Sequence, residues 1–492
     1  MEGPVKSIGA LGRERGLPGR LMEALREEGA PLGSLTLSET ISLAERHGVA
    51  PSDIAVAEAM AGQGLRYGEV IRAVLDAFKF NLFSLEVGLS KGESFLLGRV
   101  GSELAARLKK GGVLSRDRLI DKAAVYTLAA EVGNHAMGLQ PCAGTGDSCV
   151  YTGLMKALLE SRASRERIGK IGALMLKIGT LFKEGKKTTG CNMEGYGAGA
   201  AVSAAALTEF RRGGPGDVAR AFVLALSPTI GVPCTPRVIV SGLCATHIGG
   251  AVLVGDLASN LALKTSLPVA IDPDVMLAMA AKIHAAAAPV ITAINLDYMR
   301  PYFKRSTEVD RYVGEETRLK EDRQAALVVE RARAEIRELA RTANPIVSPF
   351  GEAVVGGSSI AVGSPTNMGR IAHELVRGEI RKISIGLTVD LFARRAINVP
   401  GILMGAVFGA STNDIKRYNE VLKLVSASAI EVVISQVEEP EVQRIEIEAT
   451  ERSAMIDALN RGGGRIRLID VRPSLAEARE AAERLGIKLA EA

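Results

Sequence analysis

The spacing of apolar residues changes once along this chain, close to residue 345, and this change limits the possible folds more than any other feature. Before it, apolar residues recur at helical spacing, as in residues 36–47 and 67–78. After it, short segments alternate apolar and polar residues as β-strands do; these are residues 382–389, 430–435, 442–448 and 465–471. The predicted fold class is therefore multidomain α and α/β, with an all-helical domain followed by a smaller α/β sandwich-type domain.

The chain of 492 residues is long enough to bury two or more hydrophobic cores. We expect an N-terminal extension over residues 1–34, an all-helical domain over 35–295, a charged helical linker over 296–345 and an α/β domain over 346–492. Ser52 and Ser115 are expected near two helix starts. Ser474 and Glu477 form an expected capping box for the last helix.

Composition and charge exclude several classes of protein. Aromatic residues make up 4% of the chain, with no Trp and 53 Gly, which predicts an interior of closely packed small residues. The net charge of +5 is spread along the chain, so no nucleic-acid partner is expected.

Residues 238–255 are the most apolar stretch, but Ser241 and His247 within it favour a buried helix over a membrane span. The start of the chain lacks the pattern of a signal peptide and five cysteines do not suit a disulfide framework, so a cytoplasmic protein with no membrane partner is expected.

Three cysteines, Cys191, Cys234 and Cys244, each lie among glycine or proline residues. Their spacing matches neither the short pairs of zinc sites nor the tight runs of ferredoxins. The residues alone leave two interpretations open. The cysteines are small buried side chains, or they are three thiolate ligands of one iron–sulfur cluster whose fourth iron stays open to substrate.

A loop of small polar residues precedes a predicted helix over residues 150–160. Its backbone amides and the positive end of the helix would suit a substrate carboxylate. An ordinary helix start, capped by Asp147 or Ser148, explains the same residues equally well. Cys142 and Cys149 flank this loop, and we expect them to be packing residues rather than reactive thiols.

Several motifs together resemble the bacterial iron–sulfur L-serine dehydratases. Residues 131–138, Glu-Val-Gly-Asn-His-Ala-Met-Gly, and 141–146, Pro-Cys-Ala-Gly-Thr-Gly, are similar to the family's Asn-x-x-Met-Gly and Pro-Thr-Ala-Gly-Ser-Ser-Gly stretch. Residues 190–195, Gly-Cys-Asn-Met-Glu-Gly, resemble its Gly-Cys-Gln-x-Glu-Val-Gly motif. Cys234 and Cys244 fall where the family has its other two ligand cysteines. The similarity covers most of residues 35–290.

This resemblance implies a homodimeric enzyme with a [4Fe-4S] cluster that is held by Cys191, Cys234 and Cys244. The expected substrate is a small amino acid, L-serine by default. The residues expected to bind it are Asn134, Gly144, Thr145, Gly146 and Asp147. The open iron would act on the leaving group, while a protein base removes the proton from the α-carbon.

Residues 350–472 resemble the family's β domain, which is similar to an amino-acid-binding regulatory module. The family's Ser-Ser-Ser-His-Thr motif stands here as Ser-Ser-Ile-Ala-Val at residues 358–362, and residues 397–401 replace its Gly-His-Gly-Thr-Asp motif. Both family histidines are therefore absent, and the base must come from elsewhere. The expected catalytic residues are His247, His135 and Glu194, although a structural histidine and a simple salt bridge are the competing interpretations.

Three functions remain open at the level of sequence. The first is elimination of water from L-serine to give pyruvate and ammonia. The second is an L-cysteine desulfidase that releases sulfide, which is similar to a sister branch of the family. The third is an iron–sulfur protein for sulfur transfer or sensing without lyase activity, which the loss of both histidines would suit.

Overall fold

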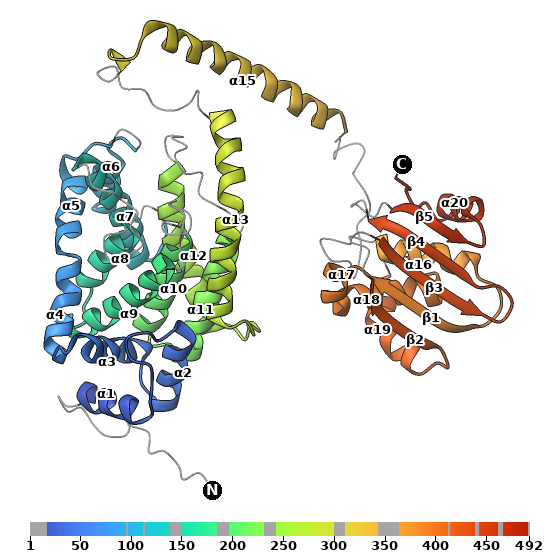
Figure 1. Ribbon diagram of the computed structural model, residues 1–492, viewed down its shortest axis with the longest axis horizontal. Coiled ribbons are helices and arrows are strands. Elements are labelled where there is room, and N and C mark those ends of the chain that lie inside the picture. Colours follow the sequence, from blue (N-terminus) through green and yellow to red (C-terminus); the bar gives the residue numbers. More distant parts are fainter. Residues whose placement is uncertain are drawn as a thin grey trace. The chain divides into compact units, whose positions relative to one another are not determined.

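The computed structural model describes residues 17–94, 97–111, 114–137, 149–184, 196–230, 243–299, 310–342, 364–411, 414–437, 442–460 and 466–490. Within them the protein is mostly helical, with one small mixed sheet near the C-terminus (Figure 1). The chain divides into two compact units, Met1–Glu330 and Arg331–Ala492. The predicted order of a helical part followed by a small α/β part is confirmed at this level.

The first unit is built from helices, and their positions agree with the helical spacing of its apolar residues. Their bounds are α1 (Leu17–Glu27), α2 (Leu37–His47), α3 (Pro51–Gln63), α4 (Tyr67–Ala77), α5 (Lys79–Ser90), α6 (Val100–Leu108), α7 (Arg118–Ala136), α8 (Cys149–Leu159), α9 (Arg165–Glu184), α10 (Gly199–Phe210), α11 (Pro215–Leu226), α12 (Leu243–Lys264) and α13 (Pro273–Met299). A short 3-10 turn, Ser227–Thr229, follows α11. The charged helix α15 (Glu315–Thr342) crosses the division between the two units.

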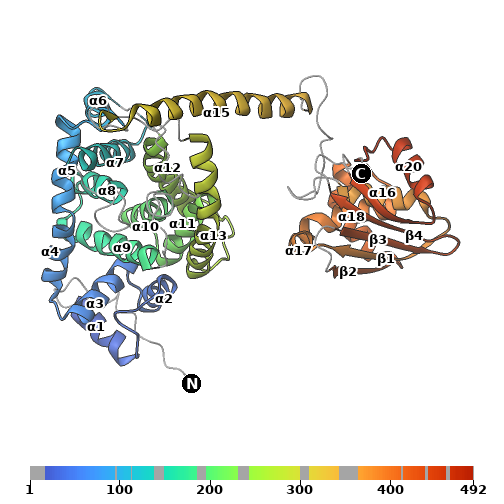
Figure 2. The same cartoon turned by 45° about the horizontal axis from the view of Figure 1, so that its top comes forward.

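Helix α10 forms the centre of the first unit. It is rich in alanine and is buried on all sides from Gly199 to Glu209, as expected of a helix without a polar face. Helices α8, α9, α11 and α12 pack around it (Figure 2). The largest side chains of the same core, among them Tyr151, Phe182 and Phe222, are fully buried.

The described part of the expected N-terminal extension is attached to the helical core. Leu21, Leu25 and Leu35 are buried in a small cluster that α1 forms with α3. The Glu58 carboxylate accepts hydrogen bonds from the backbone amides of Gly33 (3.2 Å) and Leu35 (2.9 Å). It also pairs with Lys177 of α9 at 2.8 Å. This buried carboxylate therefore joins the segment before α2 to two helices of the main core.

The helix starts differ slightly from those expected. Helix α3 begins at Pro51, one residue before Ser52, because proline has no amide hydrogen to satisfy and its fixed φ suits the first helical position. Helix α7 is capped by Asp117 rather than by Ser115, and the Asp117 carboxylate accepts from the amides of Leu119 and Ile120. The hydroxyl of Ser115 instead accepts from the Asp117 amide at 3.0 Å.

Glycines allow α7 to approach its neighbours at backbone distance. A Cβ at Gly153 of α8 would overlap the backbone nitrogen of Thr127 in α7. A Cβ at Gly133 of α7 would overlap the carbonyl oxygen of Ser84 in α5. The close packing of small residues that the composition predicts is thus present where α7 crosses α8 and α5.

The second unit contains one five-stranded sheet in the order β2-β1-β3-β4-β5. Strand β1 pairs with β2 in parallel, and the other neighbours are antiparallel. The bounds are β1 (Ile380–Leu387), β2 (Glu431–Gln436), β3 (Val442–Ala449), β4 (Ala454–Asn460), β5 (Ile466–Arg472), α16 (Ser364–Leu375), α17 (Val389–Ala393), α18 (Arg395–Phe408), α19 (Ile415–Ser426) and α20 (Leu475–Arg484). Helices α17 to α19 supply the crossover that a parallel pair requires.

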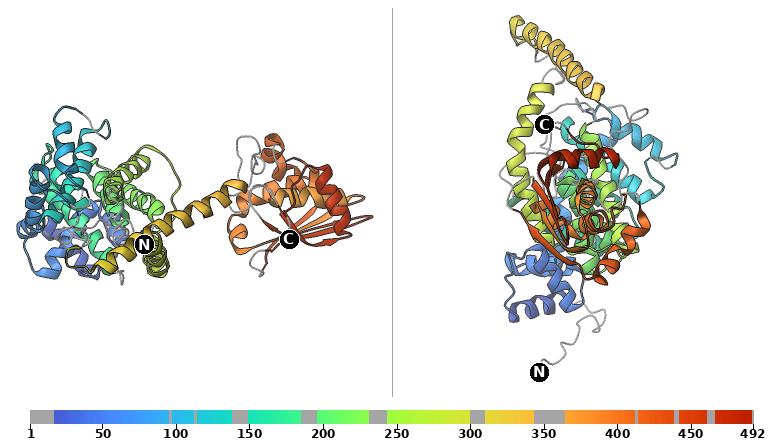
Figure 3. Two further views of the ribbon diagram at one scale, coloured as in Figure 1. Left: turned by 90° about the horizontal axis from the view of Figure 1, so that it is seen from above. Right: turned by 90° about the vertical axis from the view of Figure 1, so that its right-hand side faces the viewer.

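The buried face of this sheet is lined with isoleucine. Ile383 and Ile385 of β1 lie directly opposite Ile447 and Ile445 of β3, and all four are buried. Helix α16 lies against β3, β4 and β5 on this face, and α18 packs on α16 (Figure 3). Four of the five strands were expected from alternation of apolar and polar residues.

Strand β4 was not expected from the sequence. Its sequence, Ala-Met-Ile-Asp-Ala-Leu-Asn, has one β-branched residue and buries Met455 as well as Ile456, so alternation is weak. Asp457 is also buried, and Arg444 of β3 donates two hydrogen bonds to it, at 2.7 and 2.6 Å. Pairing with β3 and β5, rather than local preference, therefore determines this strand.

A buried carboxylate also joins α10 to α3. The Glu209 Oε2 atom accepts a hydrogen bond from the backbone amide of Ser52 at 3.2 Å. Burial raises the pKa of Glu209 to about 7, and the opposing effects of the Ser52 hydrogen bonds and of Lys170 are smaller. The carboxyl therefore binds its proton more tightly in the folded protein than in the unfolded chain.

We expect the G153A substitution to lower the free energy of unfolding by about 1–3 kcal/mol, because the added carbon forces α7 and α8 apart. The control is G68A in α4, where no heavy atom lies within 4 Å of the added Cβ. That change should be neutral or stabilising by less than about 1 kcal/mol. Urea unfolding followed by circular dichroism measures both, and equal stabilities for the two variants would contradict the tight crossing.

Stability should also depend on pH through Glu209. Its folded pKa of about 7 lies above the ordinary value of 4.5, so its contribution is complete below pH 4.5 and is lost as the pH rises through 7. The free energy of unfolding should fall by about 3 kcal/mol over this pH range. The E209Q variant should lack this decline. Urea unfolding at several pH values between 4.5 and 8 tests this, and parallel curves for the two proteins would show that Glu209 does not titrate in this range.

Candidate functional site

Most of the predicted site residues lie outside the described residues, in the segments 138–148, 185–195 and 231–242. These segments hold Gly144, Thr145, Gly146, Asp147, Cys191, Glu194 and Cys234, and also Cys142. Cys244 is the second residue of α12, and its side chain also lies outside the description. Asn134, His135 and His247 are the predicted site residues that the structure describes with their side chains.

The three segments are followed by α8, α10 and α12, and the starts of these helices lie together. At the first residue of α10, a Cβ on Gly199 would lie 2.9 Å from Cγ2 of Val150, the second residue of α8. Tyr196, in a π-helical turn just before α10, stacks on His247 of α12. Their ring centroids are 5.6 Å apart and the ring planes differ by 26°. The start of α10 therefore contacts the starts of both other helices.

This meeting of helix starts favours negative charge. The first turn of a helix has backbone amides without partners inside the helix, and the helix dipole places about half a positive charge there. Carboxylates, phosphates and thiolates are stabilised at such positions. The place where α8, α10 and α12 begin is therefore suited to an anionic ligand or to thiolate side chains.

His247 lies at this meeting point, on the same helix as Cys244 and three residues beyond it. Residues at this spacing are neighbours on a helix surface. Its ring is half-buried and held face to face with Tyr196. An imidazole in its neutral form can accept a proton, so a histidine at this place is a candidate base.

His135 lies at the end of α7, and its side chain is 10% exposed. Its Nδ1 atom is 2.6 Å from the Ser94 hydroxyl oxygen. Its Nε2 atom is 3.3 Å from Oε1 of Glu131, one turn earlier on the same helix and buried. Both ring nitrogens therefore have partners within the protein, which fixes the orientation of the His135 ring.

Asn134 is buried between α7 and α5. Its Oδ1 atom accepts a hydrogen bond from the hydroxyl of Ser84 at 2.8 Å. This bond lies beside the close crossing at Gly133 and helps to join the two helices. A role for Asn134 in substrate binding stays a prediction.

Three residues that contact the predicted histidines were not expected from the sequence: Tyr196, Ser94 and Glu131. Glu131 had a signal, because it precedes His135 by four residues and such pairs face each other on a helix. Tyr196 follows Glu194 by two residues and is one of only 8 tyrosines in the chain. Ser94 lies 41 residues before His135, and no local pattern could have connected them.

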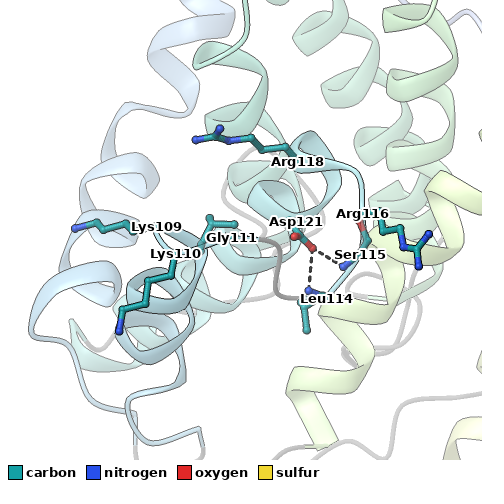
Figure 4. A pocket seen from close by; sticks show the side chains of 9 residues that line it. Lys109, Lys110, Gly111, Leu114, Ser115, Arg116, Arg118 and Asp121 are labelled. Atoms are coloured by element: carbon teal, nitrogen blue, oxygen red, sulfur yellow. Dashed lines mark hydrogen bonds between the residues drawn. The ribbon is translucent and has the colours of Figure 1, made fainter.

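A cavity of about 810 Å³ lies at the other end of α7 and is lined by several basic residues (Figure 4). Lys109 and Lys110 point away from Asp121, and the side chains of Arg116 and Arg118 leave in other directions. Asp121 accepts hydrogen bonds from the backbone amides of Leu114 (2.9 Å) and Ser115 (2.6 Å). The described lining of the cavity thus lacks the converging cations of an anion-binding site. Asp121 instead holds the loop before α7 through these hydrogen bonds.

Among the described residues, no three His, Cys, Asp or Glu side chains come together as metal ligands. The predicted cluster is not tested by this result, because none of the side chains of Cys191, Cys234 and Cys244 is within the described part. No protein-family model matches the chain, and no curated protein matches it. The resemblance to the L-serine dehydratases therefore rests on the motifs alone.

Proposed function

We propose that this chain is an iron–sulfur-dependent lyase that removes the β-substituent of a small amino acid, converting L-serine to pyruvate and ammonia. The observation that supports the proposal most is the meeting of the starts of α8, α10 and α12. Each helix directly follows a segment that carries predicted ligand or substrate-binding residues. Cys191 precedes Tyr196 by five residues, and Cys244 is already part of α12. At about 3.5 Å per residue, the chain can bring these segments to one place.

The donors fit the proposed cofactor. Three cysteine thiolates are the soft ligands that iron–sulfur clusters take, and the negative charge that they bring is favourable beside helix starts. When bound through three thiolates, a [4Fe-4S] cluster has an open iron that acts as a Lewis acid toward the leaving hydroxyl. Elimination also needs protein groups that hold the substrate and take a proton.

The chain's own residues divide this work. The amides of residues 144–147, which precede α8 in the sequence, would bind the substrate carboxylate, and Glu194 would bind its ammonium group. His247 would take the proton from the α-carbon, with Tyr196 holding the orientation of its ring. His135, fixed by Ser94 and Glu131, would position the end of α7, directly before residues 138–148.

The cysteines give the first test of this proposal. We expect C191A, C234A and C244A each to lose the cluster, because two remaining thiolates hold it poorly. C142A and C149A are the matched controls and should keep it. Anaerobic purification followed by iron and sulfide quantification measures the outcome, with circular dichroism to confirm folding. Retention of the cluster in all five variants would contradict the ligand assignment.

The histidines give the second test. We expect H247Q to lower kcat for pyruvate formation by about 10²–10⁴-fold with iron content unchanged, because a general base contributes this much. H135Q should have a smaller effect on kcat. Pyruvate and ammonia are measured side by side from L-serine and L-cysteine. Full activity in H247Q would exclude His247 as the base. Product from L-cysteine alone would make the protein a desulfidase. No product from either substrate, with an intact cluster, would contradict the proposed lyase activity.

A further inference from the structure

Helix α13 has one apolar face in the core and a second apolar face that is exposed in the described part of the first unit. Met276, Ala280 and His284 are buried at four-residue spacing, on the side toward α11 and α2. Large apolar side chains of α13 are exposed outside this contact: Val275 (59%) and Met279 (40%) on the other side of the helix, and Val290 (61%) and Ile294 (53%) beyond its buried part. A soluble helix normally has polar residues on that side. The exposed face therefore needs a partner.

The size of this face suits a protein interface. A helix of 27 residues is about 40 Å long and about 11 Å across, so the half that faces away from the core measures roughly 700 Å². Each partner of a standard interface buries about 800 Å². Many alanines along the face, such as Ala286 and Ala293, would allow a second helix to approach closely.

Charge on this face is arranged for pairing with itself. Lys282, Ala286, Pro289, Ala293 and Asp297 recur every three or four residues, and all are exposed along one stripe of the helix. A cation begins the stripe and an anion ends it. When two such helices lie antiparallel about an axis near Val290, Lys282 of each copy faces Asp297 of the other. Asp297 also has an interaction within its own chain. A carboxylate has two oxygens, so Asp297 can keep this interaction and accept a second one from Lys282 of the other copy.

We propose that α13 pairs antiparallel with α13 of a second copy of this chain, and that this helix pair is the centre of a two-fold dimer interface. The same surface then serves both subunits, as two-fold symmetry requires. This inference names the surface of the expected homodimer and does not depend on the proposed lyase activity.

A lipid bilayer is the other environment that an apolar helix of this length could enter. An 18-residue window within Pro273–Tyr298 has a mean hydropathy of 1.6, and the helix is long enough to span one. One such helix is weak evidence, and this one carries Lys282 inside the stretch and packs Met276, Ala280 and His284 against the helical core. A charged residue deep in the bilayer is costly, and a helix that packs against a globular core cannot span. The features of α13 favour a second protein copy.

The oligomeric state of the full chain tests the proposal. We expect sedimentation velocity at micromolar concentration to show a dimer of the 51.8 kDa chain. V290R should raise the dimer Kd by at least about 100-fold, because it buries two unpaired cations at the axis. The matched control is L422R on α19, whose side chain is 52% exposed, and it should leave the Kd unchanged.

The charges at the two ends of the stripe provide a test that misfolding cannot imitate. K282D and D297K should each raise the Kd by about 10-fold, whereas the double variant K282D/D297K should restore it, since the pair is only reversed. Circular dichroism confirms that each variant is folded. A monomeric wild type, a V290R dimer as tight as wild type, or flotation of the monomer with anionic lipid vesicles would each overturn the proposal.

Discussion

The close packing of small residues around α10 is the constraint on which the rest of the helical unit depends. An alanine-rich helix that is buried on every side gains little from each side chain, so its stability comes from the number of neighbours that it contacts at short distance. Gly199 at its first residue allows Val150 of α8 to come within van der Waals contact. The same approach brings Tyr196 onto His247. The packing that stabilises the core therefore also arranges the candidate site.

The fold could be predicted where local spacing and the final environment agree. Helices α2 (Leu37–His47) and α4 (Tyr67–Ala77) could be predicted because their apolar residues recur along one face, and that face is the buried one. Strand β4 shows the limit of such reasoning. Asp457 of this strand can be buried because Arg444 of the neighbouring strand donates hydrogen bonds to its carboxylate. No pattern within the seven residues of β4 indicates that partner.

The candidate site shows the same division between local and distant information. The sequence could single out His135 and His247 as rare residues beside motifs, but it could not separate their roles. The structure describes their different surroundings: Ser94 and Glu131 lie within reach of the two ring nitrogens of His135, and Tyr196 stacks on the ring of His247. These surroundings depend on contacts between residues far apart in sequence, which local patterns do not indicate.

The meeting of α8, α10 and α12 also connects the proposed cofactor to stability. The starts of three helices carry positive partial charge, and placing like charges together is unfavourable unless a negative group lies between them. Three thiolates and a substrate carboxylate would supply that charge at this place. Metal binding and folding are coupled when the site forms only in the folded protein. Under the proposed function, the cluster would therefore stabilise the contacts of Tyr196 with His247 and of Gly199 with Val150, and substrate binding would add to the same effect.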